Sequence, residues 1–224
     1  MSYNQYMSNT DNKMWKRIAE SIDDYQERMK QSPQFEHFGI KPAFKPGTGD
    51  IPGFIHDEII RQFHNPTVQE DGGKRMDQMI NGWNYAIKNS GRQPNLDDIH
   101  HIGHLVEPET NHPSQFRHVN VGVGSHSAPH KDDVPHLMST LASSIPDVKK
   151  CDDACGGNNG KTDYYETSGY GHSHPTPLDF YAQYESIHPF GDGNGRSGKI
   201  IHNWLNGTLT DPELVPDLFG GGNP

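Results

Sequence analysis

The chain has 224 residues, of which 31% are hydrophobic, and its 19 Lys and Arg against 29 Asp and Glu give a net charge of −10. This length suits one sizeable core, or one core with a small appendage. The acidic balance argues against a dedicated nucleic-acid-binding protein and against docking on an anionic membrane, because both partners attract basic surfaces.

The sequence contains no recognisable targeting or membrane-spanning segment. No apolar run approaches the roughly 18 residues that a spanning helix needs, and the N-terminus lacks the basic start and apolar stretch of a signal peptide. Cys151 and Cys155 are most simply free thiols in a reducing compartment. We therefore expect a soluble cytoplasmic protein without nucleic-acid or membrane partners.

Helical periodicity marks three segments in the N-terminal part of the chain. An apolar stripe over 14–29 predicts a first helix, and shorter stripes over 55–63 and 76–87 predict two more, the last of them capped at Gly91. We assign residues 1–92 to an N-terminal helical extension of unknown role.

The middle of the chain alternates between helical and strand patterns. Asn95 can cap a helix over 96–105, with Asp98 three residues on to complete a capping box. Valines alternate with Asn and Gly over 119–124, a period of two that predicts an edge strand or hairpin. A further helix is expected over 134–145, opened by aspartate and proline.

A long segment over 146–177, rich in Gly, Asn, Asp and Ser, then interrupts the pattern and predicts an insertion or a loop near a functional site. Helical periodicity returns over 178–187 and 200–205, and Gly207 closes the last helix. The tail over 209–224 contains prolines and glycines and is expected to be flexible. The chain is therefore predicted to be mainly α with one short β element.

The stretch IHPFGDGNGRSGK over 187–199 is the most unusual in the chain. Gly193 and Lys199 fit the spacing of a nucleotide-binding P-loop. That motif needs a hydroxyl where this chain has Ile200, and it must follow a strand, whereas the preceding segment is helical. We reject this interpretation.

A calcium-binding loop starting at Asp192 fits no better. Arg196 would place a cation where an oxygen ligand belongs, and Ser197 stands where the sharp turn requires glycine. Asn203 occupies the position of the bidentate glutamate. This interpretation also fails.

The third interpretation uses every unusual residue of the stretch, namely His188, Phe190, Asp192, Gly193, Asn194, Gly195 and Arg196. In this register they resemble the signature of the Fic family, H-x-F-x-[D/E]-G-N-G-R-x-x-R. Only the last position departs, with Lys199 in place of arginine. Upstream, a segment ending in Arg117, the alternating valines and the helix after them follow the order of a Fic domain, in which the hairpin is called the flap.

The resemblance covers about residues 95–207 and implies a Fic-type helical bundle with a short β-hairpin flap near the active site. We therefore expect a Fic domain over 93–208, carrying the Gly-rich insertion at 146–177, between the N-terminal extension and the flexible tail.

Chemistry gives each residue of the motif a task. A hydroxyl that attacks a phosphate must lose its proton, and the His188 imidazole is the suitable general base. Asp192 can ligate Mg²⁺ through oxygen, and Phe190 serves as an apolar anchor for the loop.

The rest of the motif suits a polyphosphate. Gly193, Asn194 and Gly195 have little side-chain bulk, so their backbone N–H groups can approach phosphate oxygens where the last helix begins. Arg196 adds a fork of donors for a terminal phosphate. Lys199 is also expected to contact phosphate, with the positive charge of the last motif position but without its bidentate geometry.

The resemblance implies a protein adenylyltransferase that moves AMP from ATP–Mg²⁺ to a Ser, Thr or Tyr hydroxyl of a target protein. In the family the target adds a strand to the flap, which here comprises Val119, Asn120, Val121, Gly122 and Val123. One alternative is transfer of another nucleotide or of phosphate, as in the Doc branch, which has lysine at the position of Gly195. Another is a Fic-fold module that binds nucleotide or protein without turnover.

Two further patterns bear on regulation and metal binding. Thr162 and Glu166 have the spacing of the glutamate-bearing inhibitory helix of many Fic proteins, although chance explains the pattern better and a separate inhibitory protein is possible. His100 and His104 would share a helix face, but the glutamate of a zinc hydrolase is missing between them. We expect ordinary surface or core histidines there.

Overall fold

The computed structural model describes residues 47–63, 69–123, 126–145, 175–215 and 218. The helix expected over 14–29, the two cysteines, Thr162, Glu166 and nearly all of the Gly-rich insertion lie outside the described residues.

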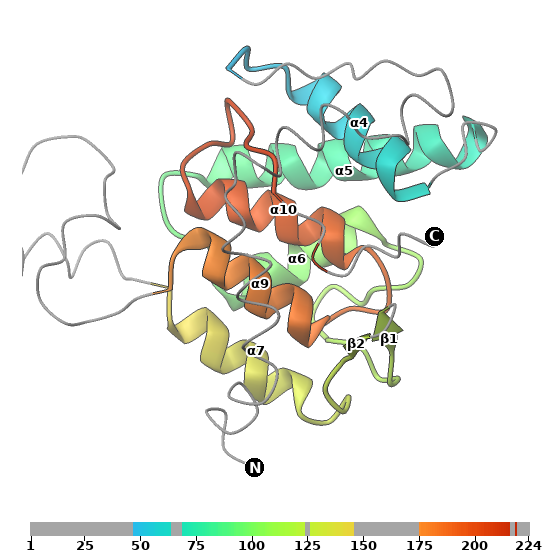
Figure 1. Ribbon diagram of the computed structural model, residues 1–224, viewed down its shortest axis with the longest axis vertical. Coiled ribbons are helices and arrows are strands. Elements are labelled where there is room, and N and C mark those ends of the chain that lie inside the picture. Colours follow the sequence, from blue (N-terminus) through green and yellow to red (C-terminus); the bar gives the residue numbers. More distant parts are fainter. Residues whose placement is uncertain (1–46, 64–68, 124–125, 146–174, 216–217, 219–224) are drawn as a thin grey trace, which may run out of the picture.

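Helices dominate the described part of the chain (Figure 1). They are α4 (Ile51–Phe63), α5 (Gln69–Asn89), α6 (Leu96–Val106), α7 (Val134–Ser143), α9 (Pro177–Ile187) and α10 (Asn194–Leu205). Strands β1 (Gly122–Val123) and β2 (His126–Ser127) form an antiparallel hairpin in which Gly122 pairs with Ser127. The prediction of a mainly helical fold with a short hairpin is confirmed.

Helix α10 occupies the centre of the bundle. It contacts α5, α6 and α9, while α4 packs on α5 and α7 packs on α9 (Figure 1). The hairpin lies beside the turn that leads from α9 into α10 (Figure 1). Within the described ranges, no helix combines the length and the apolar character needed to cross a membrane.

Helices α6 and α9 each begin with a capping box, formed by two residues that are three positions apart in the sequence. The Asn95 side chain accepts from the Asp98 N–H at 3.0 Å, and the Asp98 carboxylate accepts from the Asn95 N–H at 2.8 Å. Thr176 and Asp179 repeat this arrangement at the start of α9. Such caps satisfy N–H groups that have no partner within the helix. They set where α6 and α9 begin.

Nearly every residue of α10 is buried, including its polar ones. Ile200 and Ile201 are fully buried, as an interior helix requires. Ser197 Oγ shares a hydrogen bond of 2.7 Å with the Tyr184 hydroxyl, and the Asn203 side-chain oxygen accepts from the Glu213 N–H at 2.7 Å. Because unpaired polar groups are costly in a core, the polar residues of α10 dictate which groups surround it.

The segments on either side of the predicted Fic domain pack into the same core. Phe54 of α4 and Trp83 of α5 are fully buried in the cluster that also contains the apolar residues of α6, α9 and α10. Leu209 and Val215, in the segment expected to be a flexible tail, are buried, and the Trp83 indole donates to the Leu209 carbonyl at 2.9 Å. The domain boundaries stay predictions, but residues 209–215 are held on the core.

A buried ion pair joins α10 to α4. The Lys199 ammonium lies 2.5 Å from the Glu58 carboxylate, and both side chains are completely shielded from solvent. Neither charge can be buried alone without a large desolvation cost, so each holds the other in place.

Replacing Glu58 alone by leucine leaves the Lys199 ammonium without this carboxylate, and we expect Glu58→Leu to lower the free energy of unfolding by about 3–5 kcal/mol. Adding Lys199→Met removes the second charge and should restore most of the loss. Urea denaturation of the single and double variants measures both values. Equal losses in the two variants would contradict the pairing.

Candidate functional site

The loop between α9 and α10 has a constrained backbone at both ends. His188 ends α9 with φ at 51°, and among the described residues it is the only non-glycine with a positive φ. Gly193 precedes α10 with φ at 76°, where glycine avoids the steric cost. The left-handed conformation of His188 is uncommon and has to be held by its surroundings.

Phe190 and Asn194 lock the middle of the loop. The Asn194 side chain accepts from the Phe190 N–H at 2.9 Å and donates to the Phe190 carbonyl at 3.0 Å. The Phe190 ring is buried against Gly103 of α6, where a Cβ atom would lie only 2.3 Å from two ring carbons. Phe190 therefore has the position of the anchor that we expected, and a glycine on α6 makes room for it.

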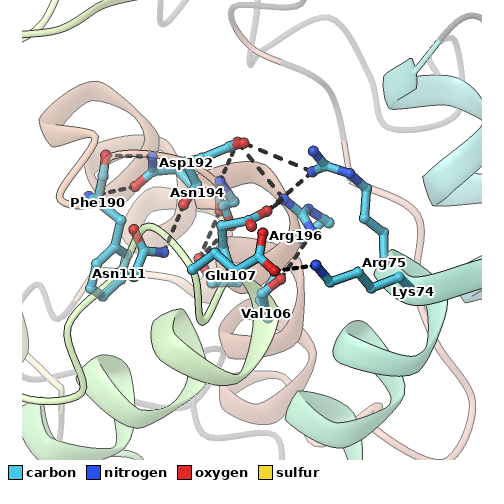
Figure 2. A network of polar contacts seen from close by, with 12 residues as sticks. Lys74, Arg75, Val106, Glu107, Asn111, Phe190, Asp192, Asn194 and Arg196 are labelled. Atoms are coloured by element: carbon cyan, nitrogen blue, oxygen red, sulfur yellow. Dashed lines mark hydrogen bonds and ion pairs between the residues drawn. The ribbon is translucent and has the colours of Figure 1, made fainter. Parts of the chain in front are cut away.

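Asp192 is the exposed acid of the loop, and cations lie near it (Figure 2). Its side chain is 53% exposed, and its Oδ1 accepts from the Gly193 N–H at 2.6 Å. Its carboxylate lies 3.7 Å from the Arg196 guanidinium and 3.8 Å from the Arg75 guanidinium. The loop thus presents a carboxylate to solvent between two arginines.

Glu107 forms ion pairs with both of these arginines (Figure 2). Its Oε2 accepts from Arg196 at 2.8 Å and from Arg75 at 3.1 Å. Arg196 is fully buried and also donates to the Val106 carbonyl at 3.0 Å, whereas the Arg75 side chain is 24% exposed. Of the two, Arg75 is the cation that reaches the surface beside Asp192.

Asn111 ties the loop to α6. Its side-chain amide donates to the Asp192 carbonyl at 2.8 Å and to the Gly103 carbonyl at 2.9 Å. A cavity of about 540 Å³ lies on this side of the loop and is lined by residues between 104 and 119 together with Phe190 and Gly191.

Burial determines the protonation of His188. It lowers the pKa of the imidazole to about 4, and the charges of Arg117 and His126 add to this, while a hydrogen bond to the Glu185 backbone and the charge of Asp192 oppose it. The ring is therefore neutral at pH 7 and able to accept a proton.

The hairpin stands next to this imidazole. The His126 ring is 2.9 Å from the Ser186 carbonyl of α9, which ties β2 to the helix that ends at His188. Val119, Asn120 and Val121 precede β1 in irregular structure, and Val119 is 47% exposed. Only Gly122 and Val123 of the predicted flap form a strand.

The structure brings together most of the predicted site residues. His188, Phe190 and Asp192 lie in one loop, and Gly193, Asn194, Gly195 and Arg196 follow at the start of α10. Lys199 is not among them, because it lies one turn further along α10 with its ammonium against Glu58. Its predicted contact with phosphate would require that ion pair to open.

The paired histidines of α6 have separate environments. His100 stacks on the Phe116 ring with centroids 4.0 Å apart, and the His104 ring is 2.7 Å from the Asn111 carbonyl. These contacts give each imidazole a packing role.

Sequence reasoning missed the groups that surround the loop, chiefly Glu107, Arg75 and Asn111. Glu107 and Asn111 follow the end of α6, and Arg75 adjoins the apolar stripe of α5. No spacing pattern marks them, because the bonds that join Glu107 to Arg75 and Arg196, and Asn111 to Asp192, each span more than 30 residues of the chain. No sequence signal replaces that information, because the burial of Arg196, which makes a carboxylate partner necessary, is itself a property of the fold.

The sequence matches no family model, and a comparison with curated proteins also finds no match. Among solved structures, the fold is similar to a Fic domain containing signaling protein from Bacteroides thetaiotaomicron VPI-5482, with a TM-score of 0.43 and 13% sequence identity. The alignment covers 86% of this chain and 69% of that one. Functional conclusions rest instead on the residues of the loop.

Adding a methyl group at Gly103 forces the Phe190 ring out of its place, and overpacking of this kind costs about 1–3 kcal/mol. We expect Gly103→Ala to be destabilising in thermal or urea denaturation. Gly73 is the matched control, because it is an exposed glycine in α5 with open space around it, and Gly73→Ala should stabilise by up to about 1 kcal/mol. Equal stabilisation by both substitutions would contradict the close packing of Phe190.

Proposed function

We propose that this chain is a protein adenylyltransferase of the Fic type, which transfers AMP from ATP to a hydroxyl of a target protein. The observation that carries the proposal is the turn from α9 to α10. There a neutral imidazole, an exposed carboxylate and the start of a helix follow one another within seven residues, from His188 to Asn194.

His188 is proposed as the general base. Its pKa of about 4 keeps the ring unprotonated at neutral pH and so available for the proton of an attacking hydroxyl, while the same shift makes it a weaker base than an ordinary imidazole. The new bond forms between the hydroxyl oxygen and the α-phosphorus, and the bond from the α-phosphorus to the bridging oxygen breaks. Pyrophosphate leaves with that electron pair, and His188 takes the proton.

The start of α10 is proposed to bind the phosphates. The first N–H groups of a helix have no partner within it, and they carry the positive end of the helix dipole. Gly195 has no side chain to obstruct a phosphate group, and the Asn194 side chain is turned back onto Phe190. The Gly193 N–H already donates to Asp192 Oδ1, so the backbone donors suited to an anion are those of Asn194 and Gly195.

Asp192 fits a magnesium ion that arrives with the nucleotide. Mg²⁺ keeps several waters and needs only one or two carboxylates in addition to phosphate oxygens. Asp192 provides one exposed carboxylate, and the described residues contain no cluster of three or more His, Cys, Asp or Glu suited to a metal. When bound, the ion would neutralise phosphate charge.

The cations divide into a surface group and an interior group. Arg75 reaches solvent beside Asp192 and is the first that an approaching triphosphate would meet. Arg196 would have to divide the N–H donors of its guanidinium between phosphate and Glu107. Lys199 needs Glu58 as its partner, so the proposal assigns it no phosphate contact.

The target is proposed to dock on the hairpin. A two-stranded sheet has free edges, and an extended segment of a partner can add to such an edge through main-chain hydrogen bonds. The tie between His126 and Ser186 keeps this edge close to His188. We infer a protein partner with a Ser, Thr or Tyr in an extended segment, and regulation by a separate protein is open to test.

Labelling with α-³²P-ATP and Mg²⁺ tests the transfer. Incubated with a cell lysate, the protein should label a target band, and both His188→Ala and Asp192→Asn should reduce the initial rate by at least about 10²-fold. The control is His136→Ala, since His136 is an exposed histidine of α7. Labelling from γ-³²P-ATP would instead indicate phosphate transfer, and calorimetric binding of ATP–Mg²⁺ without any labelling would indicate a binding module.

The lowered pKa of His188 predicts the pH dependence of its ring. Because the folded pKa is about 4, the ring stays neutral, and active as a base, from about pH 8 down to about pH 5.5, and protonates only below that. Histidine NMR resonances followed against pH measure this directly, with His188 assigned by its loss in His188→Ala. A midpoint near the ordinary value of about 6.5 would contradict it.

A further inference from the structure

Arg117 lies between the hairpin and the His188 loop and is almost completely buried, at 6% exposed. Its guanidinium donates to the His188 carbonyl at 2.8 Å, and more weakly to the Ile187 carbonyl at 3.4 Å. The backbone N–H of Arg117 donates to the Pro189 carbonyl at 2.9 Å. One residue thus holds three consecutive carbonyl groups around the proposed base.

The same guanidinium holds both ends of the hairpin segment. It donates to the Val119 carbonyl and to the Pro129 carbonyl, each at 2.7 Å. Val119 lies before β1 and Pro129 lies after β2, so these two bonds close the base of the hairpin. Hydrogen bonds from a charged donor are shorter and stronger than neutral ones, which suits them to fixing a backbone.

His188 is where such a hold is needed. It is a non-glycine residue in the left-handed region, and a conformation of this kind persists only when the surroundings determine it. The carbonyls that Arg117 binds belong to His188 itself and to its two chain neighbours. Losing them would release the backbone that aims the imidazole.

We propose that Arg117 is a positioning residue that fixes the docking hairpin and the His188 base at a set distance from one another. This inference rests on the proposed function. Arg117 acts through the backbone segments that it holds, because these place the target hydroxyl and the base so that the proton transfer is aligned. Misplacement of reacting groups by about 1 Å can cost about 10²-fold in rate.

Arginine suits this task better than lysine. Its planar fork directs several N–H groups to acceptors on different segments, whereas lysine donates from a single nitrogen. Arg117→Lys keeps the positive charge near His188 and removes the geometry. The substitution therefore separates an electrostatic effect on the imidazole from a positional one.

The test compares Arg117→Lys with the wild-type chain and with Arg92→Lys, an arginine paired with Asp98 away from the loop. Arg117→Lys should lower kcat for target labelling by about 10²-fold, while the Kd for ATP–Mg²⁺ stays within about twofold. Arg92→Lys should leave both near the wild-type values. An unchanged kcat, or a nucleotide affinity that falls in step with it, would overturn the proposal.

Amide hydrogen exchange supplies a readout that does not depend on activity. In Arg117→Lys we expect faster exchange in both 118–130 and 188–193, with the amides of α6 and α10 unchanged. Faster exchange in only one of the two segments, or throughout the core, would contradict a bridging role. A variant that fails to fold at all would also overturn the proposal, because Arg117 would then be needed for the fold itself.

The two measurements keep this inference separate from the proposed function. If the wild-type chain labels no target, adenylyl transfer fails, yet the exchange pattern still reports whether Arg117 joins the hairpin to the loop. If the wild-type chain labels and His188→Ala does not, a wild-type rate in Arg117→Lys overturns the positioning role alone. His126→Phe removes the second tie to α9 and should give a smaller loss of kcat than Arg117→Lys.

Discussion

The burial of a polar helix is the constraint on which this structure depends. Helix α10 lies among α5, α6 and α9, yet it carries Arg196, Ser197, Lys199 and Asn203 into the interior. Each buried polar group needs a partner, and several of these partners come from other helices of the bundle. Glu58 is supplied by α4, Glu107 by the end of α6 and Tyr184 by α9. Helix α4 is therefore tied to the same core as the motif.

The same constraint exposes one end of α10 and shields the rest. The helix begins at a turn in which Asp192 faces solvent, while Arg196 and Lys199 behind it are fully buried. Binding at this end can use backbone donors and Asp192 without disturbing the interior pairs. Arg196 connects the exposed turn to the buried interior, because its guanidinium lies 3.7 Å from the Asp192 carboxylate and also pairs with Glu107.

The local features of the fold were readable in the sequence. The Asn95 cap, the end of α10 just before Gly207 and the hairpin after Arg117 each depend on residues close together in the chain. The partners of Arg196 and Lys199 were not readable, because they depend on tertiary packing across 89 and 141 residues. For the same reason the phosphate role expected for Lys199 could not be judged before its carboxylate partner was located.

The first turn of α10 is proposed to bind the phosphates of a nucleotide. A ¹⁵N NMR titration with ATP–Mg²⁺ tests it most directly, because amide shifts report where the anion sits. We expect the largest shifts at the amides of Gly193, Asn194 and Gly195, and we expect Asp192→Asn to weaken nucleotide binding in the same titration. Saturable binding with its largest shifts elsewhere in the bundle, or no binding at millimolar nucleotide, would contradict it.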